Sequence, residues 1–463
     1  MDSRTLPNVG RARSRLGRIG AVAASVLVLV GVGLIPATTA VAYQNPASGA
    51  FDCSPGSVYS MQSNGDIKYV DATGAVSTFY TASGDTSGSS MNGLGIGPGG
   101  TAAYWYDRTS SGSSVQRLLG FANGSVSVLD STGFNTGASA SLVAGTVDLS
   151  SGNFLFGYFD DGSPSRFHLY SWSQSTGYTA VGNAAVNANG SDGLNGDIAF
   201  DASGNLYILS STNPQSGMSS LVITVVKAAD LQAAFQHPST GQSIPASTAS
   251  SARVRATSGF NGMALDSDGY LYLGTGTTLY KYDPTTFALV DTVTTSLANS
   301  TDLGSCGTPS TLTVQKDLPS GRYSSSDQFN LGITRDASPI TSVTTTGSVM
   351  GLQPDTAGPT PVVGGQTYSV TETAGNRTTL LSDYSSSLSC VDTANGDTQV
   401  PVANGQITIP TGQPHSAAVV CTFSNLPNAS VTISKQVADA NGNNAAPAPD
   451  WTVGAALSNP PSG

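Results

Sequence analysis

The chain has 463 residues, which is room for two to four domains, and only 10% of its residues are charged. Its formal net charge of −11 argues against nucleic-acid binding, because proteins that bind nucleic acids carry basic surfaces. Short runs of Val, Ile, Thr and Tyr alternate with Gly, Asn, Asp and Ser along most of the sequence, which predicts an all-β protein.

The first 42 residues have the pattern of an export signal peptide. Five arginines between positions 4 and 18 precede an apolar stretch at 19–35, and the small residues that end at Ala42 offer a cleavage site. The apolar stretch is slightly short for a membrane span, and an uncleaved anchor is the alternative. We therefore expect a secreted chain whose mature form, from residue 43, has no stable membrane insertion.

Export makes the four cysteines interpretable, because disulfides persist outside the cell. Cys53 and Cys306 bracket one region of the chain, whereas Cys390 and Cys421 lie together in another. Four cysteines allow three pairings, and pairing within each region is the simplest. Free buried thiols are the alternative.

A repeated phrase within residues 43–307 predicts a β-propeller. Each copy reads as a strand, a tight turn with Gly, and a second strand with aromatic residues. The copies lie at 92–106, 144–158, 195–209 and 261–274, and their starts are 52, 51 and 66 positions apart. Two further strands at 277–293 complete the last copy, and four strands in roughly 40–50 residues is the period of a propeller blade.

Both ends of this region are expected to share one blade. The strands at 57–63, 65–71 and 74–81 match the second to fourth strands of a blade, and 301–306 supplies the missing first strand. A Cys53–Cys306 disulfide would lock this closure. One shared and four complete units predict five blades, or six if one blade is missed.

The long spacing before the last copy predicts an insertion in the fourth blade. Residues 225–237 have the pattern of a short helix, and we expect a polar Ser/Thr loop from there to about 252. The Tyr-rich phrase at 279–284 and the bracketing cysteines resemble a propeller domain of unassigned activity at the N-terminus of large exported actinobacterial surface proteins. This resemblance covers most of 50–307 and implies fold and location more than activity.

Candidate metal ligands in this region have simpler explanations. Asn92, Asn195 and Asn261 recur at one blade position, with Asp302 as a possible equivalent, and lactonase-type propellers hold a channel metal with such residues. Asn-Gly turns into each inner strand explain the asparagines without a metal. The phrase at 266–269 lacks the closing Glu of a calcium loop, and His168, His237 and His415 show no ligand or triad spacing. We therefore expect no metal and no cofactor.

The strand rhythm changes after a short linker at 307–310. Strands are expected at 311–319, 327–333, 367–375 and 417–427. The pattern then restarts at 430–442 and 449–455, and Lys435 lies 119 positions after Lys316. This predicts one domain at 308–427 and the start of a second, incomplete repeat at 428–463.

Three strands of the 308–427 domain each have an apolar face that ends in a polar residue. Strand alternation places Lys316 with Leu312 and Val314, Glu372 with Tyr368 and Val370, and Asn425 with Cys421 and Phe423. The amine, the carboxyl group and the carboxamide have complementary chemistry, so we expect the three side chains to form one cluster.

The lysine after the first strand, the box Tyr368-Ser-Val-Thr-Glu372-Thr and the asparagine in the last strand resemble prealbumin-like domains of Gram-positive adhesins and pilins, of the Cna B and SpaA types. The resemblance implies a β-sandwich in which an isopeptide bond joins Lys316 to Asn425 and Glu372 promotes its formation. Cys390 and Cys421 suggest a disulfide in addition or instead. The alternative is that Lys316 extends to water at the sheet end, with Glu372 as its surface partner.

These patterns predict a non-enzymatic surface protein, secreted or bound to the cell wall of a Gram-positive, actinobacterial cell. The propeller would be a recognition head for an extracellular ligand, a glycan or a matrix protein, on a crosslinked stalk that serves adhesion. An extracellular propeller hydrolase or lyase acting on a sugar or lactone is the alternative. A third possibility is that both parts only act as spacers.

Overall fold

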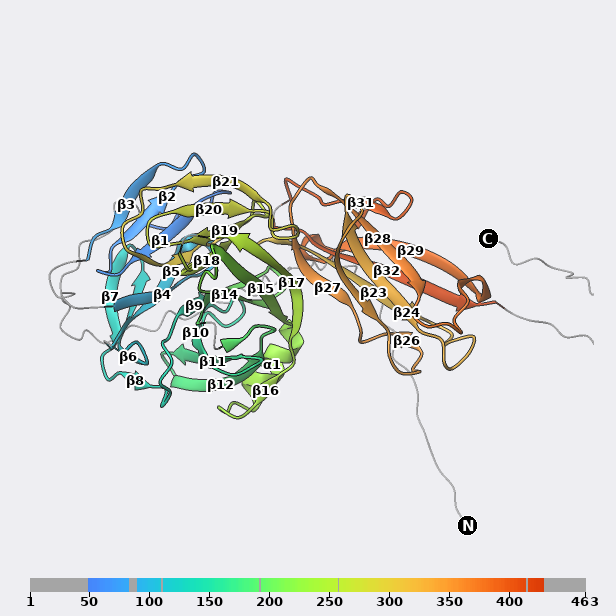
Figure 1. Cartoon of the computed structure of the whole chain (residues 1–463), viewed down its shortest axis with the longest axis horizontal. Helices are drawn as coiled ribbons and strands as arrows, with labels where there is room; N and C mark the ends of the chain where they lie inside the picture. The colour runs from blue at the N-terminus through green and yellow to red at the C-terminus, as the bar shows by residue number, and fades with distance from the viewer. Residues whose placement is uncertain are drawn as a thin grey trace, which may run out of the picture. The chain divides into compact units, whose positions relative to one another are not determined.

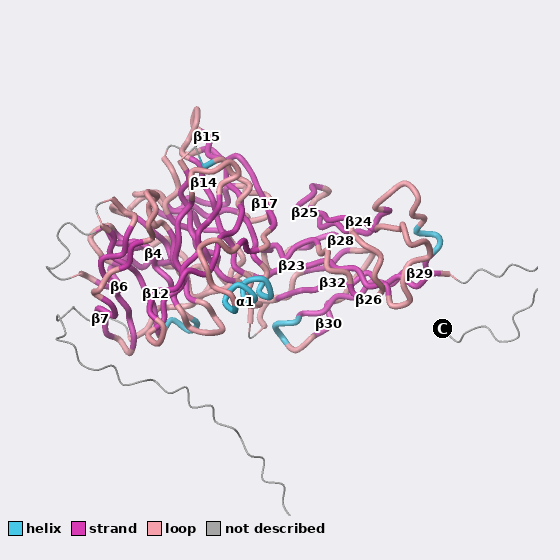
Figure 2. Tube along the Cα trace, turned by 90° about the horizontal axis from the view of Figure 1, so that it is seen from below, coloured by secondary structure: helices cyan, strands magenta, loops and turns pink. Residues whose placement is uncertain are grey.

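The computed structural model shows a nearly all-β chain, as the sequence predicts (Figure 2). It describes residues 49–82, 90–109, 111–190, 193–256, 258–413 and 415–428. The predicted signal peptide and, apart from Asn428, the predicted second repeat lie outside these residues. The helix α1 (Ala228–Gln236) falls within the predicted 225–237, and no helix in the described part is long and apolar enough to cross a membrane.

Residues 58–304, the five-sheet region, form five sheets around a common centre, and all their strands pair antiparallel except the short β16 (Figure 1). In each sheet the strands follow one another from the centre outward. The first sheet has β22 (Ser300–Gly304), β1 (Val58–Gln62), β2 (Ile67–Val70) and β3 (Val76–Tyr80), and the second has β4 (Ser90–Ile96), β5 (Ala102–Arg108), β6 (Ser114–Ala122) and β7 (Ser125–Asp130). The third has β9 (Ala144–Val147), β10 (Phe154–Phe159), β11 (Arg166–Ser173) and β12 (Gly177–Ala185), the fourth has β13 (Leu194–Phe200), β14 (Leu206–Thr212), β15 (Met218–Val226) and β17 (Ser247–Arg255), and the fifth has β18 (Gly262–Leu265), β19 (Leu271–Gly274), β20 (Leu279–Tyr282) and β21 (Leu289–Thr294). Two short strands, β8 (Phe134–Asn135) and β16 (Ser243–Ile244), pair with β6 and β12.

Glycines of the repeated phrase let the innermost strands approach one another. These strands contact in the order β4, β9, β13, β18 and β22, and β22 in turn contacts β4. A Cβ added to Gly145 would lie 2.3 Å from the Gly93 carbonyl oxygen, and one added to Gly262 would lie 2.4 Å from the Leu303 nitrogen. Larger residues would therefore force the strands apart. The sheets themselves stay separate, since no strand pairing joins one of the five to the next in the described residues.

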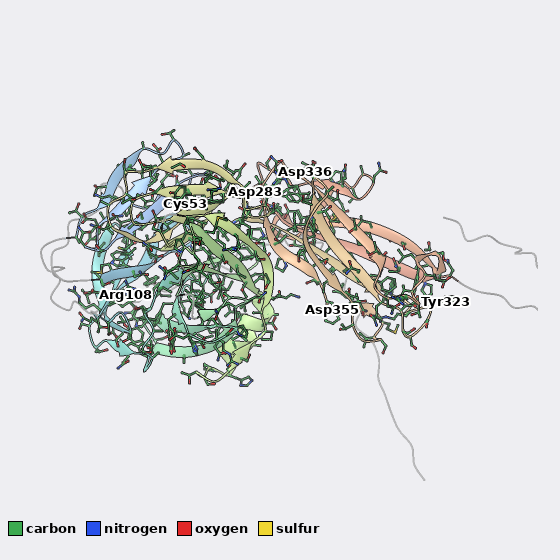
Figure 3. The ribbon with its side chains drawn as sticks, viewed as in Figure 1. Cys53, Arg108, Asp283, Tyr323, Asp336 and Asp355 are labelled. Atoms are coloured by element: carbon green, nitrogen blue, oxygen red, sulfur yellow. A yellow bond between two sulfur atoms is a disulfide. The ribbon has the colours of Figure 1, made fainter. Side chains whose placement is uncertain are left out.

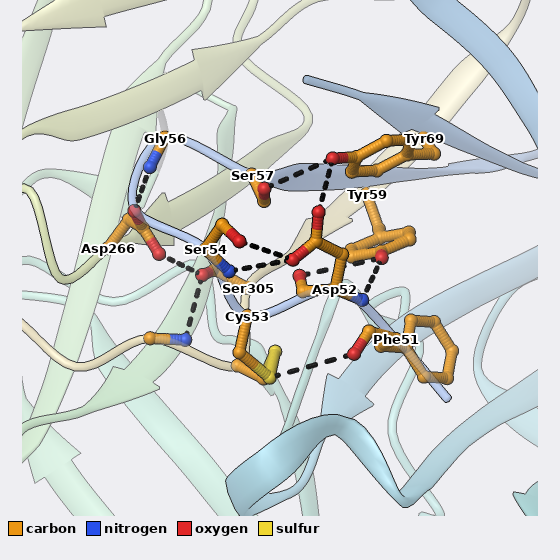
Figure 4. The surroundings of a disulfide bond; sticks show 12 residues. Phe51, Asp52, Cys53, Ser54, Gly56, Ser57, Tyr59, Tyr69, Asp266 and Ser305 are labelled. Carbon is orange, nitrogen blue, oxygen red and sulfur yellow. Dashed lines mark hydrogen bonds between the residues drawn. A yellow bond between two sulfur atoms is a disulfide. The ribbon is translucent and has the colours of Figure 1, made fainter. Parts of the chain in front are cut away.

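The prediction that both ends of the region share one sheet is confirmed. Strand β22 pairs antiparallel with β1, so that Tyr59 lies opposite Gly304. A disulfide joins Cys53 to Cys306 across 253 positions of the chain. The buried Asp266 adds a third link, because its carboxylate accepts hydrogen bonds from the Gly56 N–H and the Ser305 hydroxyl, each at 2.5 Å (Figure 4).

The insertion differs from the expected polar loop. Residues 247–255 form β17, which pairs along β15 and becomes the outermost strand of its sheet. Its Ala249 and Val254 are buried, whereas most of its polar residues are exposed. The Ser/Thr-rich sequence hid this strand, because only Ala249, Ala252 and Val254 supply apolar contacts while its backbone satisfies the edge of β15.

Residues 310–427 form a β-sandwich of two sheets. One sheet has the order β26 (Gly351–Leu352), β23 (Ser310–Leu318), β32 (Ala418–Pro427), β29 (Tyr384–Asp392) and β30 (Thr398–Val400), with β27 (Ala357–Val362) also on β23. The other has the order β25 (Ser338–Thr344), β24 (Phe329–Arg335), β28 (Thr367–Ala374) and β31 (Gln406–Thr408). The first strand β23 and the last strand β32 lie side by side and parallel, which a sequence pattern of short strands does not reveal.

The Cys53–Cys306 disulfide should stabilise the closed sheet of the five-sheet region. In the loop-entropy model a bridge over so long a loop contributes up to about 5 kcal/mol. The double variant Cys53→Ser, Cys306→Ser should therefore show faster amide hydrogen exchange in β1 and β22. Replacing Cys390 and Cys421 by Ala is the control, and unchanged exchange in β1 and β22 of the first variant would contradict the stabilising role.

Candidate functional site

The strand parity deduced for the sandwich is confirmed. In β23 the side chains of Leu312, Val314 and Lys316 are buried between the sheets. In β32 Cys421 and Asn425 face the same interior, and in β28, on the opposite sheet, Tyr368 and Val370 do so next to Glu372. The three polar residues therefore converge from three strands and from both sheets.

Lys316, Glu372 and Asn425 form one hydrogen-bonded cluster, which we call the crosslinking triad. The Lys316 Nζ lies 2.9 Å from Glu372 Oε1, and the Asn425 Nδ2 donates to the same oxygen at 3.2 Å. Lys316 also donates to the Phe423 carbonyl oxygen at 3.1 Å. Exposure is 0% for the Lys316 side chain and 5% for that of Glu372, so the alternative of a lysine extended to water is wrong.

Besides the Glu372 and Phe423 oxygens, an aromatic side chain lies close to the Lys316 amine. Its Nζ lies 4.7 Å from the centre of the Phe329 ring, which packs with Leu318 and Tyr384. Burial lowers the pKa of Lys316, and the contact with the Glu372 carboxylate opposes this shift in part. A lowered pKa populates the neutral amine, which is the nucleophilic form.

The Asn425 side chain is held at one end only. Its nitrogen is bonded to Glu372, whereas its Oδ1 is buried without a hydrogen-bond partner in the described part of the chain. Such an unpaired carbonyl is costly in a protein interior. Turning the carboxamide over would place Oδ1 against Glu372 instead.

The second disulfide occupies other positions of the same last strand. Cys390 in β29 lies directly opposite Cys421 in β32, and the two are bonded. Cys421 is four residues before Asn425 on the same face of β32. A disulfide to β29 and a crosslink to β23 therefore use different residues and do not compete.

The asparagines at the centre of the five-sheet region hold turns and strands. The Asn92 and Asn195 carboxamide oxygens accept the N–H of the glycine that follows each, at 2.8 and 3.0 Å. Asn261 accepts from Asn195 at 3.3 Å, and its own Nδ2 donates to the Ser300 carbonyl. Each carboxamide oxygen thus already accepts a hydrogen bond, and the described residues contain no group of three or more His, Cys, Asp or Glu that could hold a metal.

Sequence reasoning considered Asp302 only as an equivalent of the repeated asparagines, and it missed the buried pair that Asp302 forms with Asp197 at the same centre. Both side chains are fully buried and hydrogen-bond to each other. Asp197 also accepts the N–H groups of Gly145 and Met263, and Asp302 accepts that of Leu94. Since Asp197 belongs to β13 and Asp302 to β22, the pair joins all five innermost strands. The sequence signal that could have revealed the pair is the charged residue Asp197 within a largely apolar, Gly-containing strand.

Burial raises the pKa of both aspartates. The pKa of Asp302 is raised to about 7, and that of Asp197 well above its usual range, with the Asp302 carboxylate adding to its shift. The pair therefore holds a proton near neutral pH. A cavity of about 30 Å³ along the innermost strands has room for roughly one water.

The histidines are scattered. His168 in β11 stacks on Tyr158, with its Nε2 3.1 Å from Asp160 Oδ2. His237 ends α1, and His415 donates its backbone N–H to Asn395. None of the three joins the crosslinking triad or the aspartate pair.

Comparisons with known proteins support the C-terminal fold. Residues 311–427 match the SpaA_3 family model, a prealbumin-like fold domain. A search of curated protein sequences finds no match.

Among solved structures, similar chains include a Bacteroides caccae protein of unknown function, with 10% identity, 54% of this chain and 98% of that chain covered, and a TM-score of 0.31. A putative 6-phosphogluconolactonase from Bacteroides uniformis has 12% identity over 53% of this chain and 72% of its own, with a TM-score of 0.30. The major pilin from Streptococcus pyogenes has 14% identity over 50% and 66%, with a TM-score of 0.16. At these scores the likenesses carry no argument about function.

The aspartate pair predicts a pH dependence of stability. Because the folded-state pKa of Asp302 is about 7 and an unfolded aspartate titrates near 3.9, the stabilising contribution is complete below about pH 4 and is lost as pH rises to about 7. Asp197→Asn, which mimics the protonated carboxyl group, should make the urea midpoint of the five-sheet region fall less between these pH values. The exposed Asp291→Asn is the matched control, and equal slopes in both variants would contradict the assignment.

Proposed function

We propose that the chain is an extracellular surface protein in which residues 43–307 form a five-bladed β-propeller head and residues 308–427 form a covalently braced stalk domain. The observation that carries this proposal is the buried crosslinking triad between the first and last strands of a prealbumin-like domain. An amine, a carboxyl and a carboxamide enclosed together have a clear use in bond formation, whereas as a purely structural cluster they are costly to bury.

The proposed reaction is a single maturation step. The neutral Lys316 amine attacks Cγ of Asn425, and Glu372 donates a proton to the carboxamide and accepts one from the attacking nitrogen. The Lys316 Nζ–Asn425 Cγ bond forms, the Asn425 Cγ–Nδ2 bond breaks, and ammonia leaves. No oxidant or cofactor is consumed, and the product contains an amide in place of an amine and a carboxamide.

A crosslink at this place would change how the domain bears load. Pulling on residues before β23 and after β32 separates two parallel neighbouring strands, and their hydrogen bonds alone would resist it. A bond between Lys316 and Asn425 would carry the force past the whole domain, while the Cys390–Cys421 disulfide holds β29 to β32. This property suits a stalk on a cell surface.

The head proposal rests on the five sheets, their cyclic contacts and the closure by both ends. Since the centre is filled by the aspartate pair and apolar strands, we infer that recognition uses the outer surfaces rather than a channel. The ligand class we propose is an extracellular glycan or matrix protein, on a protein held at the surface of a Gram-positive cell.

The isopeptide bond predicts a mass defect. After reduction of its two disulfides, the mature chain should weigh less than its sequence by one ammonia, and peptide mapping should recover Lys316 joined to Asn425. Glu372→Gln keeps hydrogen bonding but cannot shuttle a proton, and Lys316→Arg removes the nucleophile, so both should have the full mass.

The control for this prediction is Lys281→Arg, because Lys281 forms an ion pair with Asp268 in the five-sheet region and should not affect the crosslink. Under mechanical force the Glu372→Gln chain should gain the contour length between positions 316 and 425, apart from the disulfide loop, whereas the wild type should not. An unmodified wild-type mass would refute the bond.

The head is tested by binding. The full mature chain on arrays of glycans and matrix proteins should retain at least one class of ligand and release it chemically unchanged. The Lys316→Arg variant should bind equally, because the triad lies in the sandwich. Cleavage of a bound sugar or lactone would contradict the non-enzymatic assignment and favour the hydrolase or lyase.

A further inference from the structure

One end of the sandwich carries a group of exposed large apolar side chains, which we call the apolar pole. Its members are Tyr323, Val349, Met350, Leu352, Leu380 and Leu426, with exposures of 49%, 60%, 66%, 59%, 57% and 48%. In the described residues of the five-sheet region, Leu289 and Val290 are the large apolar side chains of comparable exposure. Grouped exposure of this kind marks an interaction surface.

Strand register places these side chains together. Leu352 lies opposite Asp317, which lies opposite Ser424, so the three share the outer face of their sheet. Leu426 is two residues beyond Ser424 and points to the same face.

The loops at this end add the remaining members. The guanidinium of Arg322, next to Tyr323, donates to the Val349 carbonyl oxygen at 2.8 Å. Figure 3 shows Tyr323 at the end of the sandwich where the described chain leaves β32.

The chain leaves the sandwich beside this pole through a held residue. The Asn428 N–H donates to the Asp383 carbonyl oxygen at 2.8 Å, and its Nδ2 donates to that of Ser382 at 2.9 Å. Leu380 of the apolar pole belongs to the same turn, since its carbonyl oxygen accepts from the Asp383 N–H. The exit point is therefore fixed on the pole itself.

Only Ala429 separates this held residue from the phrase at 430–435 that repeats the first strand of the sandwich. An extended residue spans at most about 3.6 Å, so the repeated phrase begins within roughly 7 Å of Asn428. We infer that the apolar pole is the docking surface for residues 430–463 of this same chain. The pole, the held residue and the short link together would make a stiff joint between successive repeats.

This inference does not depend on the crosslinking triad, so the two fail separately. A photo-crosslinking benzoylphenylalanine in place of Met350 in the full mature chain tests it. We expect crosslinks from position 350 to residues 430–463. The same probe at Val290, on the five-sheet region, is the matched control and should give none to that segment. An equal mixture of light and heavy isotope chains distinguishes crosslinks within a chain from those between chains.

Crosslinks only between chains would overturn the inference in favour of self-association, and no crosslink to 430–463 would overturn it outright. A probe-free measurement guards against a misfolded variant. Met350 in the wild-type chain should form its sulfoxide about threefold more slowly than in the double variant Val431→Asp, Ile433→Asp, which replaces two apolar residues of the repeated first-strand phrase. Equal rates would contradict docking.

Discussion

Pairing between the first and last strands of each part is the constraint on which the rest of the structure depends. In the five-sheet region β22 completes the sheet that β1 begins, and in the sandwich β32 lies along β23. Such pairings join residues far apart in the chain, so their loop-closure entropy must be offset by strong local contacts. The first seam has a covalent tie, the Cys53–Cys306 disulfide, and the second has the buried ion pair between Lys316 and Glu372 beside it.

Buried charge appears where strands from different sheets meet. The Asp197 and Asp302 carboxylates collect backbone N–H groups from strands that do not pair with one another, and a shared proton relieves their repulsion. In the sandwich, Glu372 of one sheet neutralises Lys316 of the other. Glu372 is also the only glutamate in the 463 residues, and every other acidic residue is an aspartate, whose side chain is shorter.

These two clusters differ in what they can become. Both carboxylate oxygens of Asp197 and both of Asp302 accept a backbone N–H. The aspartate pair is therefore a fully hydrogen-bonded structural link that shares a proton. The triad is incompletely satisfied, because Asn425 Oδ1 lacks a partner in the described residues and Lys316 has a lowered pKa. The two clusters therefore differ in how fully the protein satisfies their buried polar groups.

The sequence by itself determined the strand class, the shared sheet at the ends of the five-sheet region, and the inward side of Lys316, Glu372 and Asn425. The strand class and the inward sides are local features, because alternation of side chains and turn residues acts over a few positions. The shared sheet pairs distant residues, and it could be predicted because the repeated phrase left one strand missing at the start of the region. Only the tertiary structure decided that β23 and β32 are parallel neighbours, that β17 replaces a polar loop, and that Asp197 meets Asp302. Those outcomes depend on contacts between residues as much as about 100 positions apart, which no local pattern encodes.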